Sequence, residues 1–201
     1  MVADPLAVAF AELRATRDTT TGDPGVVEDY LALLESIPHA LHREGGPRHL
    51  TASAVVIDEP AEHVALVWHR KGRFWVQPGG HLEADESSFE RAARREVAEE
   101  IGLEDLQRVG PGPAVLHRHL LDAAFGACTE HWDVQYLLRA PARASALPLT
   151  ASEESPEVRW VPWPLHGDGP GRSTSALPEG TVADMAGKLD ALAPYLARYA
   201  D

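Results

Sequence analysis

The sequence predicts an α+β fold in which helices pack against a β-sheet. Three patterns in the 201-residue chain support this fold class. Short runs rich in Val, Ile, Leu and aromatic residues are typical of strands. An amphipathic helix interrupts these runs, and a second helical stripe of apolar residues lies near the end of the chain. Strands, a central helix, further strands and a terminal helix indicate an α+β sandwich.

Six segments have the composition of strands. They are rich in β-branched and apolar residues and are separated by charged residues, Gly and Pro. The predicted strands cover residues 50–57, 63–69, 74–77, 114–117, 134–138 and 157–161. A Gly-Gly turn at 79–80 and the central helix fall between the third strand and the fourth.

The central helix is predicted over residues 88–101. Its apolar residues recur at the spacing of one helix face. These residues are Phe89, Ala93, Val97 and Ile101. Ser87 is the predicted N-cap, because Glu90 follows at the third helical position and completes a capping box. Gly102 suits the left-handed residue that ends many helices.

Helical patterns also occur towards both ends of the chain. Residues 3–15 are rich in Ala, and apolar residues recur at helical spacing over 27–34. We therefore interpret residues 1–46 as an N-terminal helical extension and residues 47–201 as the main domain, with a C-terminal helix that Thr181 caps. The extension is expected to cover one side of the core. The alternative role is a contact between two copies of the chain in a homodimer.

The composition excludes several classes of function. A formal net charge of −13 argues against a surface for nucleic acid polymers, because such surfaces are basic. No segment has the roughly 20 apolar residues that are needed to cross a bilayer. The start of the chain lacks the basic and apolar regions of a signal peptide. The single cysteine, Cys128, fits a reducing compartment, so we expect a cytoplasmic protein without a membrane partner.

Three glutamates crowd together near the end of the central helix. Glu96, Glu99 and Glu100 stand at positions i, i+3 and i+4, where like charges destabilise a helix. On a helical wheel Glu96 and Glu100 border the apolar stripe, while Glu99 lies further out. A cation among them removes the repulsion, and hard divalent metals prefer carboxylate oxygen. The cluster is therefore a candidate metal site.

The segment with these glutamates resembles the Nudix box of the Nudix hydrolase (MutT-like) superfamily. That box reads G-x5-E-x7-R-E-U-x-E-E-x-G-U, where U is aliphatic. Residues 95–103 match its end in full, and Gly80 stands at its first glycine. Eight residues rather than seven separate Glu86 from Arg95, which resembles a longer form of the box in some bacterial members. The extra residue is expected in the loop before the helix, and it leaves the role of Glu86 open.

The resemblance implies both a fold and a reaction. The Nudix fold is a mixed sheet between helices. Its members generally cleave a nucleoside diphosphate linked to another moiety, by water attack at phosphorus with bound Mg²⁺ or Mn²⁺. By this resemblance the metal ligands are Glu96, Glu99, Glu100 and the backbone carbonyl of Gly79 or Gly80. Glu96 would also lie close to the attacking water, and Arg95 would orient a glutamate by ion pairing.

Charged residues outside the box are candidates for substrate contacts. Residues 69–73 form a basic cluster in an acidic chain, and Arg70 and Arg73 are its candidate phosphate ligands. The alternative is a solvated hairpin turn. Some members of the superfamily take a further carboxylate from a loop after the box, and Glu153 and Glu154 are the best candidates for it here. For these two residues the alternative is an acidic surface loop.

A second metal site among the histidines is an alternative hypothesis. His117 and His119 share a strand face, and His131 stands near Asp133, so a His–carboxylate zinc site is conceivable. The spacing follows no clear zinc-ligand pattern, which disfavours this site. Cys128 has no identifiable activating base, so we interpret it as structurally or incidentally placed rather than as a nucleophile.

Two other functions stay open beside a metal-dependent pyrophosphohydrolase. A non-catalytic nucleotide-sensing module is disfavoured because such modules often lose a box glutamate, and all three are present here. An isoprenoid diphosphate isomerase typically needs a cysteine and a glutamate, but Cys128 lies in no recognisable motif. The box does not name the small-molecule substrate, because specificity depends on variable loops, here 118–132 and 150–180.

Overall fold

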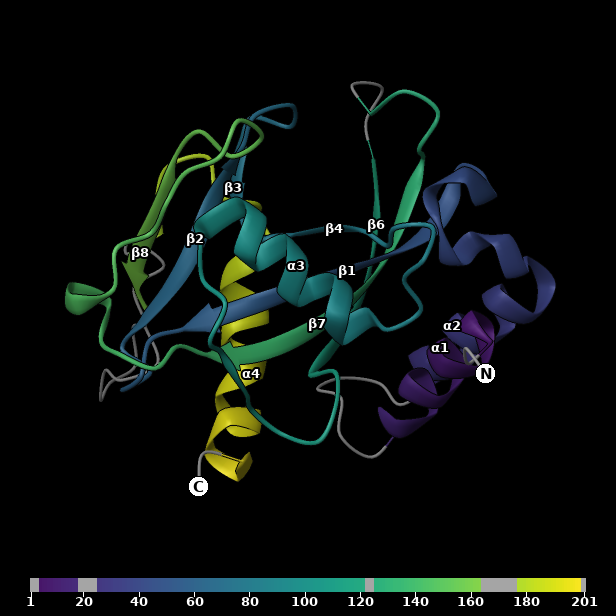
Figure 1. Ribbon diagram of the computed structural model, residues 1–201, viewed down its shortest axis with the longest axis horizontal. Helices are drawn as coiled ribbons and strands as arrows, with labels where there is room; N and C mark the ends of the chain where they lie inside the picture. Colours follow the sequence, from purple (N-terminus) through teal and green to yellow (C-terminus); the bar gives the residue numbers. More distant parts are fainter. Residues whose placement is uncertain (1–3, 18–24, 122–124, 164–176, 200–201) are drawn as a thin grey trace.

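The computed structural model describes residues 4–17, 25–121, 125–163 and 177–199. Within these residues eight strands form one mixed sheet, and helices cover both of its faces (Figure 1). The strands are β1 (Arg48–Ile57), β2 (His63–His69), β3 (Phe74–Val76), β4 (Gly79–His81), β5 (Gln107–Arg108), β6 (Val115–Leu120), β7 (Glu130–Arg139) and β8 (Val158–Pro162). The helices are α1 (Pro5–Ala15), α2 (Gly25–Ser36), α3 (Phe89–Ile101) and α4 (Met185–Tyr199), with short 3₁₀ turns at Pro38–Leu41, Arg43–Gly45 and Ala144–Ala146. This architecture confirms the predicted fold class. None of the helices in these ranges is long and apolar enough to cross a membrane.

The sheet is built around β1 and β7, which run parallel from the pair Arg48–Glu130 to the pair Ile57–Arg139. The other strand pairs are antiparallel. Every residue of β1 after its first is buried, as expected for a parallel strand that is covered on both faces. On its other edge β1 changes neighbour along its length, because β2 pairs with its end and β4 with its middle.

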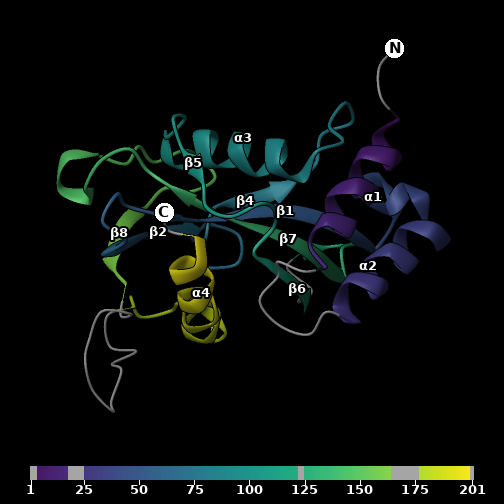
Figure 2. The same ribbon diagram turned by 90° about the horizontal axis from the view of Figure 1, so that it is seen from below.

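Side chains of the sheet alternate between two apolar clusters, one on each face. On β1, Ala54 and Val56 join the cluster that includes α1, α2 and α3, whereas Val55 and Ile57 join the cluster that includes α4. Figure 2 shows α3 and α4 on opposite faces of the sheet, with α1 and α2 gathered at one end. The helix that carries the glutamate cluster is therefore fixed by a core of its own.

All six predicted strands are present, and β4 and β5 were not predicted. The Gly-Gly pair, expected as a turn, instead forms β4 and pairs with β1, so that Gly79 lies opposite Ser53. A Cβ on Gly79 would lie 2.2 Å from Cβ and 2.7 Å from Cα of Ser53. The close approach needs glycine, and this requirement, not a turn, accounts for the residue type.

Two predicted helix caps are wrong by a few residues. Ser88, not Ser87, is the N-cap of α3, because its side chain accepts a hydrogen bond from the Arg91 N–H. At the other end Gly102 has φ 73°, which confirms the predicted left-handed stop. Thr181 does not cap α4, since it forms a bridge with Trp75 while α4 begins only at Met185.

The N-terminal helices cover one side of the core, as expected, and also hold α3. Leu13 of α1 and Leu34 of α2 are fully buried in the apolar cluster of α3. The Glu12 carboxylate accepts hydrogen bonds from the backbone N–H of Phe89 at 2.9 Å and of Glu90 at 3.4 Å. These N–H groups belong to the first turn of α3, where a helix has no internal acceptors. A side chain of α1 thus completes the N-terminus of the glutamate helix.

Candidate functional site

A cavity of about 1190 Å³ lies beside α3 and β4. Its wall includes backbone of Gly79 and Gly80, side chains from the turn between β2 and β3, and the loop before β8. The charged side chains on this wall are Arg43, Glu44, Arg70, Lys71, Glu83, Arg95, Glu96, Glu99, Glu100, Asp133, Glu153 and Glu154. Carboxylates and cations therefore face the same space.

The three glutamates of α3 lie on this wall with different degrees of burial. The side chain of Glu96 is 13% exposed and that of Glu99 is 56% exposed, while Glu100 is buried. This confirms the orientation that the helical wheel predicts. Glu100 is fixed on both oxygens, because Gly79 N–H donates to Oε2 at 2.8 Å and Ser155 Oγ donates to Oε1 at 2.5 Å.

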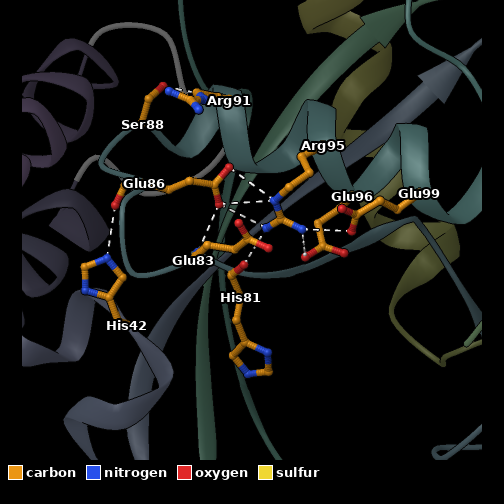
Figure 3. Close-up of polar contacts among 9 residues, drawn as sticks. All are labelled: His42, His81, Glu83, Glu86, Ser88, Arg91, Arg95, Glu96 and Glu99. Carbon is orange, nitrogen blue, oxygen red and sulfur yellow. Dashed lines mark hydrogen bonds and ion pairs between the residues drawn. The ribbon is translucent and has the colours of Figure 1, made fainter.

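Arg95 holds the carboxylates of the site together (Figure 3). Its Nη1 donates to Glu96 and to Glu99, each at 2.9 Å. Its Nη2 donates to the backbone carbonyl of His81 at 2.8 Å and to the buried Glu86 at 3.0 Å. Arg95 therefore links Glu86, Glu96 and Glu99, and Glu86, whose role the sequence leaves open, anchors its guanidinium from the loop before α3.

Burial makes the charged form of two glutamates unfavourable. It raises the pKa of Glu96 to about 7, although Arg95 acts in the opposite direction and Glu100 and Glu99 add to the rise. The pKa of Glu100 is also raised by burial, against the hydrogen bonds from Ser155 and Gly79. A cation bound nearby would lower the pKa of such buried carboxylates and stabilise their charged form.

The donors fit a hard divalent cation. Three carboxylates converge on the cavity wall, and a Cβ on Gly80 would lie 2.4 Å from Oε1 of Glu96. The backbone of β4 thus lies directly against a glutamate carboxylate, where a side chain would fill the space. Carboxylate oxygens are ligands that Mg²⁺ and Mn²⁺ prefer, so the chemical type of these donors suits such an ion.

The structure separates the predicted substrate residues. Arg70 and Glu154 lie on the cavity wall, and the Arg70 N–H donates to the Glu154 carbonyl at 3.4 Å. Arg73 is exposed on the turn after β2 with φ 58°, and it is not among the residues that line the cavity. Lys71 of the same basic cluster does line it.

Several contributors to the site were not predicted. Ser155 donates a hydrogen bond to the Glu100 carboxylate, whereas the sequence predicts only its neighbours Glu153 and Glu154 as site residues of that loop. Asp133 is buried on the cavity wall and accepts hydrogen bonds from Thr51 at 2.9 Å and from Ser53 at 2.6 Å. Sequence patterns do not reveal these contacts, because the partners come from other elements, α3 for Ser155 and β1 for Asp133.

Among the described residues, the ligand atoms that gather closely enough to hold a metal ion do not include those of His117, His119 or Asp133. Asp133 is engaged by its hydroxyl donors and by the Gln135 amide at 2.6 Å. His117 points to a different carboxylate, with Nε2 at 3.1 Å from Asp184. His119 stacks on His117, with their ring centroids 5.4 Å apart.

Known proteins resemble this chain in sequence and in fold. The model of the NUDIX domain family matches residues 47–174. A C. elegans Ap4A hydrolase in a binary complex is similar in structure, with 17% identity over 75% of this chain and 98% of that chain, and a TM-score of 0.52. A NUDIX family hydrolase from Clostridium perfringens shares 22% identity over 72% and 98% of the two chains, with a TM-score of 0.49. No curated protein matches the sequence. With the family model covering more than half of its residues, the chain belongs to the Nudix hydrolase family.

Proposed function

We propose that this protein is a metal-dependent pyrophosphohydrolase. Its substrate is a nucleoside diphosphate linked to another moiety, and the bond is cleaved by water attack at phosphorus. The observation that carries the proposal is the convergence of Glu96, Glu99 and Glu100 on one cavity that also receives Arg70 and Lys71. The cavity is large enough for a small-molecule ligand of this size class.

The proposed cofactor is Mg²⁺ or Mn²⁺, held by the three glutamates and the backbone carbonyl of Gly80. When bound, such an ion neutralises phosphate charge and lowers the pKa of a coordinated water. Glu99, the most exposed of the three, is reached directly from the cavity. Glu100 is held in place by Ser155 and Gly79 before any ligand binds.

Glu96 is the proposed general base. Its side chain is only 13% exposed and lies on the cavity wall, where the carboxylate can accept a proton from an attacking water. Arg95 is oriented by Glu86 and keeps Glu96 and Glu99 in position. We assign the phosphate contacts to Arg70, which lines the cavity from the turn between β2 and β3.

Glu154 is the proposed further carboxylate of the site. It lies on the cavity wall, and its charge is among those that raise the pKa of Glu100. The loop that carries it is tied to the basic turn, since Nη1 of Arg70 donates to the Glu153 carbonyl at 3.4 Å. These contacts support the interpretation as a site loop over that of an ordinary acidic surface.

The test is a substrate panel with a charge-removing variant. Wild-type protein, Glu96→Gln and the control Glu104→Gln, which alters an exposed glutamate just after α3, are incubated with nucleoside diphosphate derivatives and Mg²⁺ or Mn²⁺. Release of phosphate or mononucleotide is measured. Loss of a general base is expected to lower kcat about 100-fold or more, with the control unchanged.

Two results would contradict the proposal. Full activity of Glu96→Gln would show that Glu96 is not the general base. Inactivity of well-folded wild-type protein on every compound, with retained binding of some of them, would favour a nucleotide-sensing module instead.

A further inference from the structure

Four side chains with metal-binding atoms converge outside the glutamate cluster. His49, His81, Cys128 and His131 each offer one ligand atom, and these atoms all lie within 4.8 Å of one another. The three imidazole rings form a triangle, with centroid separations of 5.0 Å, 4.9 Å and 5.1 Å. We propose that these residues form a zinc site that is distinct from the metal site of the box.

The sheet itself brings the histidines together. His49 of β1 and His131 of β7 are register partners in the parallel pair. His81 of β4 is the register partner of Thr51, which shares a face of β1 with His49. Residues paired across strands lie on the same face, so the three rings project from one side of three neighbouring strands.

Cys128 enters from the loop before β7. Thr129, the next residue, donates its N–H to the Pro47 carbonyl at 2.8 Å, which holds the loop beside the start of β1. Cys128 is only partly buried and lines the cavity together with His81 and His131. A metal ion therefore has an entry path to the four side chains.

The hydrogen bonds and burial of His49 favour the uncharged ring that a metal ion needs as a ligand. Nδ1–H of His49 donates to the Gly46 carbonyl at 2.9 Å, so in the neutral ring Nε2 carries the lone pair. This lone pair accepts a hydrogen bond from Nε2 of His81 at 3.1 Å, which a metal ion bound between the two rings would replace. A carbonyl acceptor on the outer nitrogen is the usual support of a metal-bound histidine. Burial also lowers the pKa of His49, in agreement with an uncharged ring.

His131 provides an independent sign of a missing ligand. Its Nε2 is buried and, among the described residues, has no hydrogen-bond partner. Burial and the neighbouring histidines lower the pKa of His131 to about 3, so the ring does not gain a charge near neutral pH. A buried polar atom without a partner costs free energy, and coordination of a metal would satisfy it.

The ligand set selects zinc rather than magnesium. Three imidazoles and one thiolate make a closed tetrahedral set, with bonds of about 2.0–2.1 Å to nitrogen and about 2.3 Å to sulfur. Hard cations prefer oxygen instead. On binding, the Cys128 thiol loses its proton to solvent and the thiolate coordinates the ion. Four protein ligands leave no open position, so the ion would act as a structural link between β1, β4 and β7.

This link would steady the strand that carries Gly80. His81 follows Gly80 directly, and its carbonyl accepts a hydrogen bond from Arg95. Zinc would therefore hold the backbone against which the glutamates pack, without taking part in hydrolysis. The inference does not depend on the proposed reaction.

Cobalt provides a specific probe, because Cys128 is the only cysteine of the sequence. Metal-free full-length protein is titrated with Co²⁺ and with Zn²⁺, and absorption, metal content and mass in solution are measured. We expect tetrahedral Co²⁺ bands and a thiolate-to-cobalt charge-transfer band that saturates at one Co²⁺ per chain and is lost when Zn²⁺ displaces the cobalt. That band must disappear in Cys128→Ser and persist in Glu96→Gln, which alters only the box.

A second variant tests whether the histidines bind the ion together with the Cys128 thiol. His131→Ala is expected to lower Zn²⁺ affinity at least about 10-fold, since even outer contacts of metal ligands are worth that much. The control His117→Ala, a histidine that pairs with Asp184, should keep the wild-type affinity. Circular dichroism confirms that each variant is folded. Absence of the charge-transfer band, unchanged affinity of folded His131→Ala, or one cobalt shared by two chains would overturn the proposal.

Discussion

Gly79 and Gly80 are neighbours, but an added methyl group meets a different obstacle at each. At Gly79 it would meet Cα and Cβ of Ser53, which belong to the middle of β1 and cannot move without the sheet. At Gly80 it would meet the carboxylate of Glu96, the far end of a flexible side chain. One glycine is therefore required by the fold and the other by the site.

Replacing each glycine by alanine should separate stability from activity. Gly79→Ala is expected to lower the free energy of unfolding by about 1–3 kcal/mol, the usual cost of overpacking. Gly80→Ala should remain nearly as stable as the wild type but displace Glu96, with a loss of about 100-fold in kcat, typical for a catalytic group moved by about 1 Å. Urea unfolding and the hydrolysis assay measure the two effects. If both variants lost the same stability and Gly80→Ala kept the wild-type kcat, the two glycines would not differ in role.

At the scale of elements, the turn between β1 and β2 is organised by one buried carboxylate. Asp58 accepts hydrogen bonds from the N–H groups of Glu62 at 2.8 Å, His63 at 2.9 Å and Ala144 at 3.1 Å. Burial alone would raise the pKa of Asp58, but these donors outweigh it and lower the pKa below its ordinary value. The turn is thereby connected to the segment that follows β7.

Asp58→Asn is expected to destabilise the protein in a pH-dependent way. The folded-state pKa is lowered, so the stabilisation is present above the unfolded value of about 3.8 and is lost as the pH falls through the folded value. At neutral pH the variant should lose about 1–3 kcal/mol, because buried donors lose a charged acceptor. Urea unfolding at neutral and acidic pH measures the difference.

The control for Asp58 is Asp105→Asn, which changes an exposed aspartate. It should match the wild type at each pH. A constant difference between wild type and Asp58→Asn throughout acid titration would show that the carboxylate is not the source of the effect.

At the scale of the whole molecule, the N-terminal helices are joined to the sheet and the glutamate helix by buried contacts. Tyr30 of α2 donates to the Asp133 carbonyl of β7 at 3.0 Å, and Glu12 of α1 accepts from Tyr136 at 2.9 Å. We therefore propose that residues 1–46 fold together with residues 47–201 rather than as a separate unit. Self-association through these helices stays a prediction that the mass of the protein in solution tests.

Glu12→Ala tests how far α3 depends on α1. The substitution leaves two N–H groups in the first turn of α3 and the Tyr136 hydroxyl of β7 without their acceptor, so the free energy of unfolding should fall by at least about 1–2 kcal/mol, the cost of losing an N-cap. Thermal and urea unfolding measure this, with Glu35→Ala on the exposed side of α2 as the control. A variant as stable as its control would mean that water replaces the carboxylate and that α3 does not need the extension.

The sequence by itself determined the elements that depend on neighbours along the chain. The apolar stripe and glycine stop of α3, the strand segments and the inward orientation of Glu96 and Glu100 follow from local periodicity, and the structure agrees with them. The family was evident for the same reason, because the box is one continuous segment. The N-cap of α3 is also a local feature of the chain, and the prediction of Ser87 differs from the observed Ser88 by one residue.

Tertiary structure alone decided what depends on strand pairing and on contacts between distant segments. It gave Glu86 its partner, placed Arg73 outside the cavity and brought Glu12 to the first turn of α3. The histidine–cysteine cluster has the same origin, since parallel pairing of β1 and β7 joins His49 to His131. Period and propensity describe how a residue relates to its neighbours in sequence, whereas these contacts arise when separate apolar faces are buried against one another.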